Sequence, residues 1–266
     1  MYWYDGQLIA RDTLELSLNN PGLLYGATVF TTLRIYQQSL KHPLTNWSAH
    51  WQRLHHAVET VSWEAPNWDQ VKQGAEKLIS HFPVLRITLF PDGQELIIGR
   101  NLPKDLAQSQ EGGVCTWLST NPDYARSLPH LKTGNYLAPW LALRQAQKLG
   151  AKEAILIDKE GNWLESSTGN LWGWKDSCWY TPPLKAGILP GTMRQQLLNW
   201  LESSHQNIQV NRSWSEDFVK ELETLAYTNS VLEVIPIHTV LSSQGDLTYN
   251  PKHSTLQELT SFFAKG

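Results

Sequence analysis

Short stretches of alternating hydrophobic and polar residues open the chain, and this pattern predicts strands joined by turns. Residues 2–9 (YWYDGQLI) predict a hairpin that turns at Asp5 and Gly6, because Asp-Gly suits a two-residue hairpin loop. Residues 28–40 (TVFTTLRIYQQSL) are rich in β-branched residues and predict a strand pair with a weaker turn. We expect these strands to begin a small mixed sheet.

The hydrophobic spacing then changes to three and four residues, which predicts helices. Residues 45–61 begin with two N-cap candidates, Thr45 and Asn46, and carry an apolar stripe along one helix face. A second helix is expected at 68–78, and the apolar run at 84–90 predicts a strand. These elements complete an α/β unit.

The periodic pattern is weaker in the next part of the chain. Residues 91–99 and 104–113 are therefore interpreted as turn and loop. From this change we expect a small N-terminal α/β domain over residues 1–115, an interdomain loop over 116–127 and a larger C-terminal domain over 128–266.

Periodicity returns in the second half as helices and strand pairs. A helix from Thr133 is expected to stop at Gly150, since glycine is common just after a helix. The hairpin within 153–167 is expected to turn between Asp158 and Gly161. The remaining expected elements are a strand pair at 171–182, a helix at 193–204, a strand-like segment at 224–240 and a closing helix at 254–265.

Composition and charge narrow the functional class. The chain has 266 residues and a formal net charge of -3, with enough apolar residues for a core but no long run of lysine or arginine. The two cysteines, Cys115 and Cys178, have neither disulfide nor metal spacing, and the N-terminus lacks the features of a signal peptide. We expect a cytoplasmic protein with a small-molecule partner, without nucleic acid, membrane or metal.

Three ordered segments of the second half suggest a pyridoxal phosphate site. Lys132 offers an amine that can hold the cofactor's aldehyde, and Glu165 offers a carboxylate that can keep its ring nitrogen protonated. The glycine-framed turn 187–194 (GILPGTMR) offers backbone N–H groups at a helix start, which suit a phosphate. A single lysine or carboxylate is usually a solvated surface group, so the argument depends on the whole series.

The same segments resemble the class IV aminotransferase family, the fold-type IV enzymes that use pyridoxal phosphate. The resemblance covers nearly the whole chain and implies an α/β (α+β) fold, with a small N-terminal domain and a larger C-terminal domain around a barrel-like sheet. It also implies a homodimer with an active site in each subunit near the interface. The motifs that carry it are YDGQLI, GLLYGATVFTTLR, HWQRL, LKTGNYL, LESSTGNLW, YTPPLKAGILPGTMRQ and YTNSVLEVIPI.

This resemblance implies roles for individual residues. Lys132 would bind the cofactor and then act as the base that moves protons at the substrate carbon. Glu165 would contact the ring nitrogen, and Arg53 in HWQRL would bind the phosphate with its planar guanidinium. Without the resemblance, a helix-surface salt bridge would be the ordinary role of Arg53.

Further cofactor contacts are implied around the phosphate. Gly191, Thr192 and Met193 would bind it through backbone N–H groups at a helix start. Ser230 is either a phosphate contact or a strand-end serine that caps backbone groups. Tyr136 is either a partner of the cofactor's phenolic oxygen or a buried core residue.

The segment VFTTLR at 29–34 bears on the type of reaction. Most aminotransferases of this family have an acidic residue after the phenylalanine, whereas threonine follows here, as in the aminodeoxychorismate lyases that the segment resembles. Thr32 is then the candidate that passes or orients a proton for the departing enolpyruvyl group, with Thr31 as a substrate contact. Two β-branched threonines also simply suit a strand.

The implied reaction converts 4-amino-4-deoxychorismate to 4-aminobenzoate and pyruvate, in folate biosynthesis. Its dicarboxylate substrate needs cationic partners, for which Arg34 and Arg126 are candidates, and both arginines also suit structural ion pairs. The alternative is a D-amino-acid or branched-chain aminotransferase on the same scaffold. A non-catalytic protein that binds pyridoxal phosphate is a more distant alternative.

The chain departs from the family pattern at two places. Residues 20–28 (NPGLLYGAT) lack both charged residues of the usual DRGLLYGDG segment, which concerns loop geometry more than cofactor chemistry. Phe90 and Pro91 stand where many members have an arginine-glycine pair. The loop that faces the substrate is therefore expected to differ.

Overall fold

A computed structural model describes residues 1–264, which divide into two compact units. The first unit comprises residues 1–103 and 131–136, and the second comprises 104–130 and 137–264. The break after Pro103 falls before the boundary expected at 115, and the segment that carries Lys132 belongs to the first unit. Lys265, at the end of the expected closing helix, and Gly266 lie outside the described residues.

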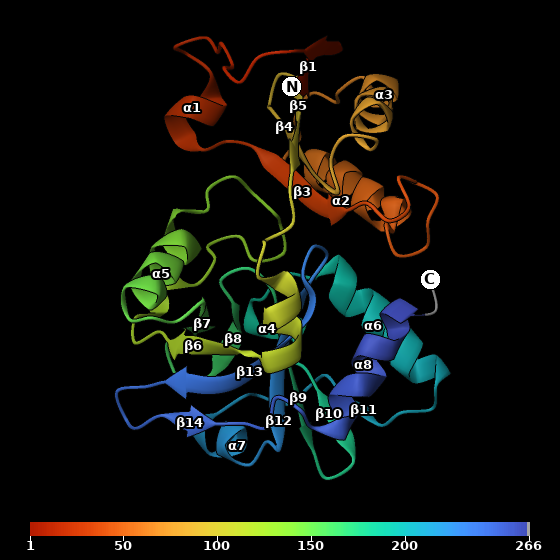
Figure 1. Cartoon of the computed structure of the whole chain (residues 1–266). Helices are drawn as coiled ribbons and strands as arrows, with labels where there is room; N and C mark the ends of the chain where they lie inside the picture. The colour runs from red at the N-terminus through yellow and green to blue at the C-terminus, as the bar shows by residue number, and fades with distance from the viewer. Residues whose placement is uncertain (265–266) are drawn as a thin grey trace. The chain divides into compact units, whose positions relative to one another are not determined.

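The first unit contains an antiparallel sheet in the strand order β2-β1-β5-β4-β3, with helices α2 and α3 packed on one face (Figure 1). Asp5 and Gly6 have φ angles of 46° and 76°, so the expected hairpin turn is confirmed. The strands are β1 (Tyr2–Tyr4), β2 (Gln7–Ile9), β3 (Val29–Arg34), β4 (Val84–Leu89) and β5 (Glu95–Arg100), and the helices are α1 (Pro21–Tyr25), α2 (Trp47–Thr60) and α3 (Trp68–Leu78).

Side chains of β3 alternate between the two faces of this sheet, and the alternation separates the two threonines. Leu33 belongs to the core formed with α2 and α3, and Thr31 lies on the same face. Phe30 and Thr32 lie on the opposite face, where Thr32 pairs across the sheet with Arg86 of β4. The two threonines therefore meet different surroundings.

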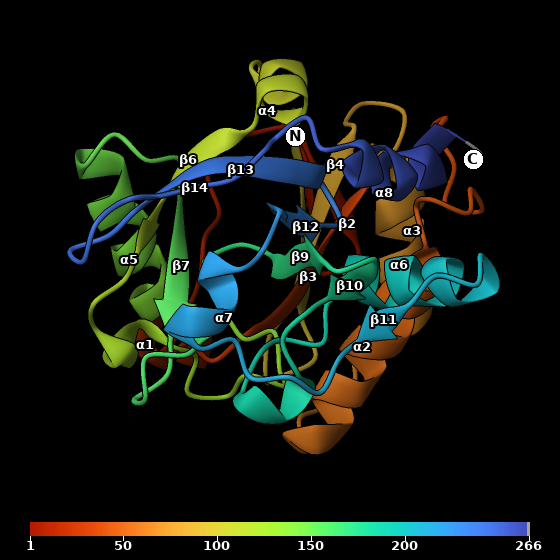
Figure 2. The ribbon, with the colours of Figure 1, turned by 90° about the horizontal axis from the view of Figure 1, so that it is seen from below.

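The second unit is built on a larger sheet in the order β11-β10-β9-β12-β13-β6-β7-β8, with β14 paired to β13. The strands wrap into a half-barrel, and β6 runs parallel to both of its neighbours, β13 and β7 (Figure 2). Helix α5 packs on β7, whereas α6 and α8 pack on β12 and β13 and against each other.

The elements of the second unit have the following bounds. The strands are β6 (Val114–Leu118), β7 (Glu153–Ile157), β8 (Trp163–Ser166), β9 (Asn170–Lys175), β10 (Cys178–Tyr180), β11 (Ile208–Gln209), β12 (Thr224–Asn229), β13 (Glu233–Leu241) and β14 (Leu247–Thr248). The helices are α4 (Leu106–Gly112), α5 (Leu137–Lys148), α6 (Thr192–Ser203), α7 (Glu216–Lys220) and α8 (Ser254–Ala264), with 3-10 turns at Pro122–Tyr124 and Leu184–Ala186.

Tryptophans fill much of the core of the second unit. Trp172 and Trp179 are fully buried and meet edge to face, with ring centroids 6.3 Å apart. They pack with Leu197 and Leu201 of α6, and each fully buried side chain of this size contributes at least about 2 kcal/mol of hydrophobic stabilisation. These tryptophans are core residues and not an exposed platform for ligands.

Three elements replace expected loops. Strand β5 covers most of the second half of the expected turn segment 91–99 and extends to Arg100. Helix α4 lies within 104–113, and β6 overlaps the expected interdomain loop. All three elements are short. Strand β5 is fixed by pairing with β4 across a tight turn, and β6 is fixed by pairing with strands that are distant in the sequence. The expected strand pair at 28–40 is reduced to β3 and one bridge between Tyr36 and Ser39.

The described residues include no helix that is both long and apolar enough to cross a bilayer.

Candidate active site

Lys132 is held beside β3 by backbone hydrogen bonds within the first unit. The Phe30 N–H donates to the Lys132 carbonyl at 2.9 Å, and the Gly134 N–H donates to the Thr28 carbonyl at 2.6 Å. A Cβ at Gly134 would lie 1.9 Å from Thr28 Oγ1, so this close approach requires glycine. The backbone that carries the lysine is therefore fixed without help from the lysine side chain.

The Lys132 ammonium faces aromatic rings on the open side of β3. Its Nζ lies 4.8 Å from the centroid of the Phe30 ring and 5.9 Å from that of Tyr136. The two rings meet edge to face at 6.2 Å, and Tyr136 is only half-buried. Cation–π attraction holds the amine on the strand face that also carries Thr32.

Thr31 lies on the core face of β3 and is fully buried. Its Oγ1 lies 2.6 Å from Nδ1 of His50, which joins β3 to α2. Burial, followed by the charges of Arg53 and Lys132, lowers the pKa of His50 well below its usual value, so the imidazole is neutral. The Thr31 hydroxyl therefore binds His50 in the core, and its expected contact with a substrate stays a prediction.

Arg53 follows His50 by three residues on α2 and therefore lies on the same side of the helix. Its side chain is half-buried. The hydrogen bond between Thr31 and His50 anchors the helical turn that presents this guanidinium. The position of Arg53 is thus set by the core and not by a surface loop.

Arg86 is a candidate that the sequence did not single out. Its guanidinium carbon lies 3.5 Å from the centroid of the Phe30 ring, on the face shared with Thr32. Burial, followed by the charge of Arg100, lowers the pKa of Arg86 to about 10. Arg34 and Arg100 lie on the same face, each paired across the sheet with Val84. Clustered, partly desolvated cations favour an anionic ligand.

In the second unit Glu165 is buried in an ion pair. Its Oε1 accepts a hydrogen bond from Nε of Arg126 at 2.7 Å, and the side chains are 3% and 7% exposed, respectively. Its Oε2 accepts from the Leu189 N–H at 3.3 Å. Carboxylate oxygens have further lone pairs, so Glu165 keeps the capacity to accept a ring N–H. Arg126 thus orients Glu165, and its expected contact with a substrate carboxylate stays a prediction.

The peptide of Leu189 is bound from both sides. Its N–H reaches Glu165, and its carbonyl accepts from Nδ2 of Asn170 at 2.9 Å. Two residues later, a Cβ at Gly191 would lie 2.0 Å from Asn170 Oδ1, so only glycine fits against this amide. We call these contacts of Glu165 and Asn170 with Leu189 the Leu189 clamp. It fixes the start of the turn that leads into α6.

Helix α6 begins at this turn with Gly191 as its N-cap residue, and no side chain of the described residues caps it by a hydrogen bond. Its first N–H groups and dipole suit an anion. Thr192 Oγ1 lies 2.6 Å from Ser230 Oγ, which places Ser230 at the helix start and supports its phosphate role. Met193 is buried, so it can contribute only through its backbone.

Arg194 adds a buried positive charge in the first turn of α6. Its Nε donates to Thr181 Oγ1 and its Nη2 to the Pro182 carbonyl, both at 3.2 Å. Burial lowers the pKa of this arginine to about 10. The sequence did not identify Arg194 as a functional residue, because its burial follows only from tertiary packing. Its charge reinforces the helix dipole in attracting an anion.

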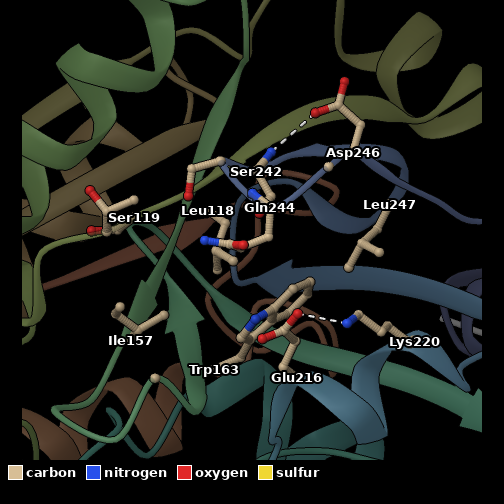
Figure 3. Close-up of a pocket in the computed structure, with 14 residues that line it drawn as sticks. Leu118, Ser119, Ile157, Trp163, Glu216, Lys220, Ser242, Gln244, Asp246 and Leu247 are labelled. Carbon is tan, nitrogen blue, oxygen red and sulfur yellow. Dashed lines mark hydrogen bonds and ion pairs between the residues drawn. The ribbon is translucent and has the colours of Figure 1, made fainter.

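A separate cavity of about 300 Å³ lies elsewhere in the second unit (Figure 3). It lies among the ends of β6 and β7, helix α7 and the hairpin between β13 and β14, where Glu216 pairs with Lys220 at 2.6 Å. Its described lining includes none of the expected site residues. The cavity therefore has no part in the chemistry considered below.

These residues fit pyridoxal phosphate by three observations. The turn before α6 offers backbone N–H donors beside the buried guanidinium of Arg194. Gly191 at the helix start has no side chain, and its neighbours leave no room for one. The buried carboxylate of Glu165, which can accept a further hydrogen bond, binds the Leu189 N–H of the same turn.

The family model described as Amino-transferase class IV matches residues 28–240, so the chain belongs to this family. Pyridoxal phosphate is the cofactor of the family, which confirms that expectation. The chain is similar in structure to a hypothetical aminotransferase from Mycobacterium tuberculosis in its PLP-bound form, with a TM-score of 0.82 and 18% identity, over 98% of this chain and 97% of that one. The expected fold class is thereby confirmed.

Two curated relatives cover most of the chain. It is 24% identical over 253 residues to aminodeoxychorismate lyase of Bacillus subtilis (strain 168), spanning 89% of this chain and 85% of the relative. It is 21% identical over 263 residues to the branched-chain-amino-acid aminotransferase of Escherichia coli (strain K12), spanning 90% and 84%. The resemblance to the lyases is confirmed, but the relatives divide between two reactions.

Proposed function

We propose that this protein is an aminodeoxychorismate lyase that uses pyridoxal phosphate to form 4-aminobenzoate and pyruvate, in folate biosynthesis. One observation carries the choice of reaction. Thr32 shares a strand face with Phe30, over whose ring the Lys132 ammonium lies, while Thr31, where most aminotransferases have an acid, is bound to His50 in the core. This strand segment thus places a hydroxyl on the face that carries Phe30 and the Lys132 ammonium, and a hydroxyl there suits the proton transfer of a lyase.

When bound, pyridoxal phosphate supplies an aldehyde for the substrate's amine and a protonated ring that withdraws electrons from the neighbouring carbon. Lys132 is the residue that would hold this aldehyde, and its free amine would be the base that takes the proton from C4 of the substrate. Glu165 would accept the N–H of the ring nitrogen, and the hydrogen bond from Arg126 orients this carboxylate. These residues together make C4 acidic.

Loss of the enolpyruvyl group completes the reaction. The Thr32 hydroxyl orients or delivers a proton to this group as its bond to the ring carbon breaks, and pyruvate forms from the released enol. The ring that remains is aromatic, which makes the step strongly downhill. Arg86 and Arg34 are the cations that we assign to the substrate carboxylates, since Arg126 is bound to Glu165.

The direct test mixes purified protein, loaded with pyridoxal phosphate, with enzymatically generated aminodeoxychorismate. Formation of both pyruvate and 4-aminobenzoate in equal amounts would support the lyase. The second candidate is a class IV transaminase, which the similarity to the Escherichia coli enzyme favours. Cofactor binding without products, together with half-reactions on amino acids, would replace the lyase with the transaminase.

The two threonines of β3 give a matched pair of variants. We expect Thr32→Val to lower kcat for product formation by about 10²-fold or more, because it removes a proton-transfer group without changing side-chain shape. We expect Thr31→Val to lower the free energy of unfolding by about 1 to 3 kcal/mol, because Nδ1 of buried His50 loses its partner. Kinetics and chemical denaturation of both variants measure the difference. Equal losses of activity would remove Thr32 from the mechanism.

We also propose that the protein is a homodimer, with helix α5 in its interface. Leu137, Trp140 and Leu141 are 62%, 49% and 41% exposed and lie on one side of this helix. Trp140→Glu is expected to give particles of single-chain mass, 30.3 kDa, by light scattering, since a charge replaces the largest apolar group. Gln73→Glu, which adds the same charge at an exposed position of α3, should leave the mass unchanged.

A further inference from the structure

A buried carboxylate outside the mechanism lies at the start of β7. Glu153 is 2% exposed, and its Oε1 accepts from the Ala154 N–H at 3.0 Å and from the Ser167 hydroxyl. Its Oε2 accepts from the Thr168 hydroxyl. Burial raises the pKa of Glu153, while the hydrogen bonds from Ser167 and Thr168 act in the opposite direction. Three donors thus converge on one carboxyl group.

Two of these donors belong to the turn between β8 and β9, residues 166–169. The Ser166 N–H donates to the Gly169 carbonyl at 2.8 Å, and the Gly169 N–H donates to Ser166 Oγ at 2.9 Å. A Cβ at Gly169 would lie 2.4 Å from the Thr228 carbonyl oxygen, so the turn is pressed against β12. Glu153 closes this turn from the β7 side, where the Ser167 N–H also donates to the Ala154 carbonyl at 2.8 Å.

The residues on either side of this turn are the two members of the Leu189 clamp. Glu165 precedes the turn and binds the Leu189 N–H, and Asn170 follows it and binds the Leu189 carbonyl. A shift of the turn would therefore move both side chains. It would also move the Leu189 peptide, which leads into the start of α6.

We infer that Glu153 is a positioning residue of the cofactor site, which holds the turn 166–169 so that Glu165 and Asn170 keep the α6 turn in its anion-binding form. The inference rests on the proposed use of pyridoxal phosphate by these residues. A buried carboxyl is costly, and an apolar residue of similar size would fill the same space at lower cost if packing were its only role. The hydroxyls of Ser167 and Thr168 give the carboxyl a role that packing cannot supply.

The test measures the dissociation constant of pyridoxal phosphate from the protein by tryptophan fluorescence, beside the thermal midpoint of the cofactor-free form. Glu153→Ala is expected to weaken cofactor binding by about 10- to 100-fold, the range for groups that orient ligand-binding side chains. Glu153→Gln keeps an acceptor for Ser167 and should restore affinity to within about fivefold of the wild type. Such a rescue would show that hydrogen bonding and not charge is required.

Glu95 provides the matched control. It is 1% exposed in the first unit and accepts hydrogen bonds from Trp3 Nε1 and the Gly6 N–H, both at 2.8 Å. Glu95→Ala should lower the thermal midpoint without changing cofactor affinity. Unchanged affinity in Glu153→Ala, with a loss of thermal stability like that of Glu95→Ala, would overturn the inference.

A second variant covers the case in which Glu153→Ala does not fold. Thr168→Val removes a donor from the half-buried end of the turn and should weaken cofactor binding by a smaller factor in the same direction, whereas unchanged affinity would count against the inference. A wild-type protein that binds the cofactor but forms no 4-aminobenzoate would contradict the lyase and leave this test intact. A wild-type protein that binds no pyridoxal phosphate would overturn both.

Discussion

Lys132→Ala is expected to lower turnover by at least about 10³-fold and to remove the visible absorbance band of bound pyridoxal phosphate. The expected loss is large because one amine both holds the cofactor and moves the substrate proton, and general acid–base catalysis alone contributes about 10² to 10⁴-fold. The fold should survive, since Phe30 binds the backbone carbonyl of Lys132 and not its side chain. Steady-state kinetics, an absorbance spectrum and a thermal melt measure the three effects.

Lys148→Ala is a suitable control for this variant. Lys148 is an exposed lysine in the last turn of α5, outside every contact assigned to the site, and its loss should leave turnover and spectrum unchanged. Normal turnover in Lys132→Ala would end the assignment of this lysine. A normal rate without the visible band would require another base for the reaction.

Glu165→Gln is expected to lower kcat by about 10²-fold or more, because a neutral amide does not hold the ring nitrogen protonated and an electrostatic partner of the reaction is lost. It also leaves the buried charge of Arg126 without its counterion. Breaking a buried ion pair at one end costs about 3 to 5 kcal/mol of stability. The variant should therefore show both a kinetic defect and a lower free energy of unfolding.

The double variant Arg126→Met with Glu165→Gln separates these two effects. Removing both charges should recover much of the stability, because no buried ion remains uncompensated, while kcat should stay low. Denaturant titration and steady-state kinetics on the single and double variants make the comparison. Recovery of kcat in the double variant would mean that Glu165 acts only through Arg126.

Local patterns predicted much of the fold. Helix α3 has the bounds expected from the sequence, Trp68–Leu78, because its apolar spacing is regular and the Asn67 side chain caps its first N–H groups. Strand β6 was missed because its partners are distant in the sequence, with Val114 paired to Ile237 and Trp117 to Ala154. A short strand of this kind is defined by its neighbours more than by its own residues.

The same distinction applies to the site. The chemistry that we propose for Lys132 and Glu165 follows from residue type and motif, and the alternation of β3 is enough to put Thr31 and Thr32 on different faces. Sequence alone did not indicate that Arg126 binds Glu165, because nothing local joins residues 39 positions apart. The burial of Arg194 likewise arises from packing against Thr181, which only the folded chain brings into contact.

The Leu189 clamp has a consequence for the thermodynamics of cofactor binding. Because the N–H and the carbonyl of one peptide are fixed by the side chains that flank the turn between β8 and β9, the turn before α6 has little conformational freedom left to lose. A ligand that binds there orders few residues, so more of its interaction energy remains as affinity. Folding has already ordered this turn, so the phosphate site that we propose there would be preorganised before the cofactor binds.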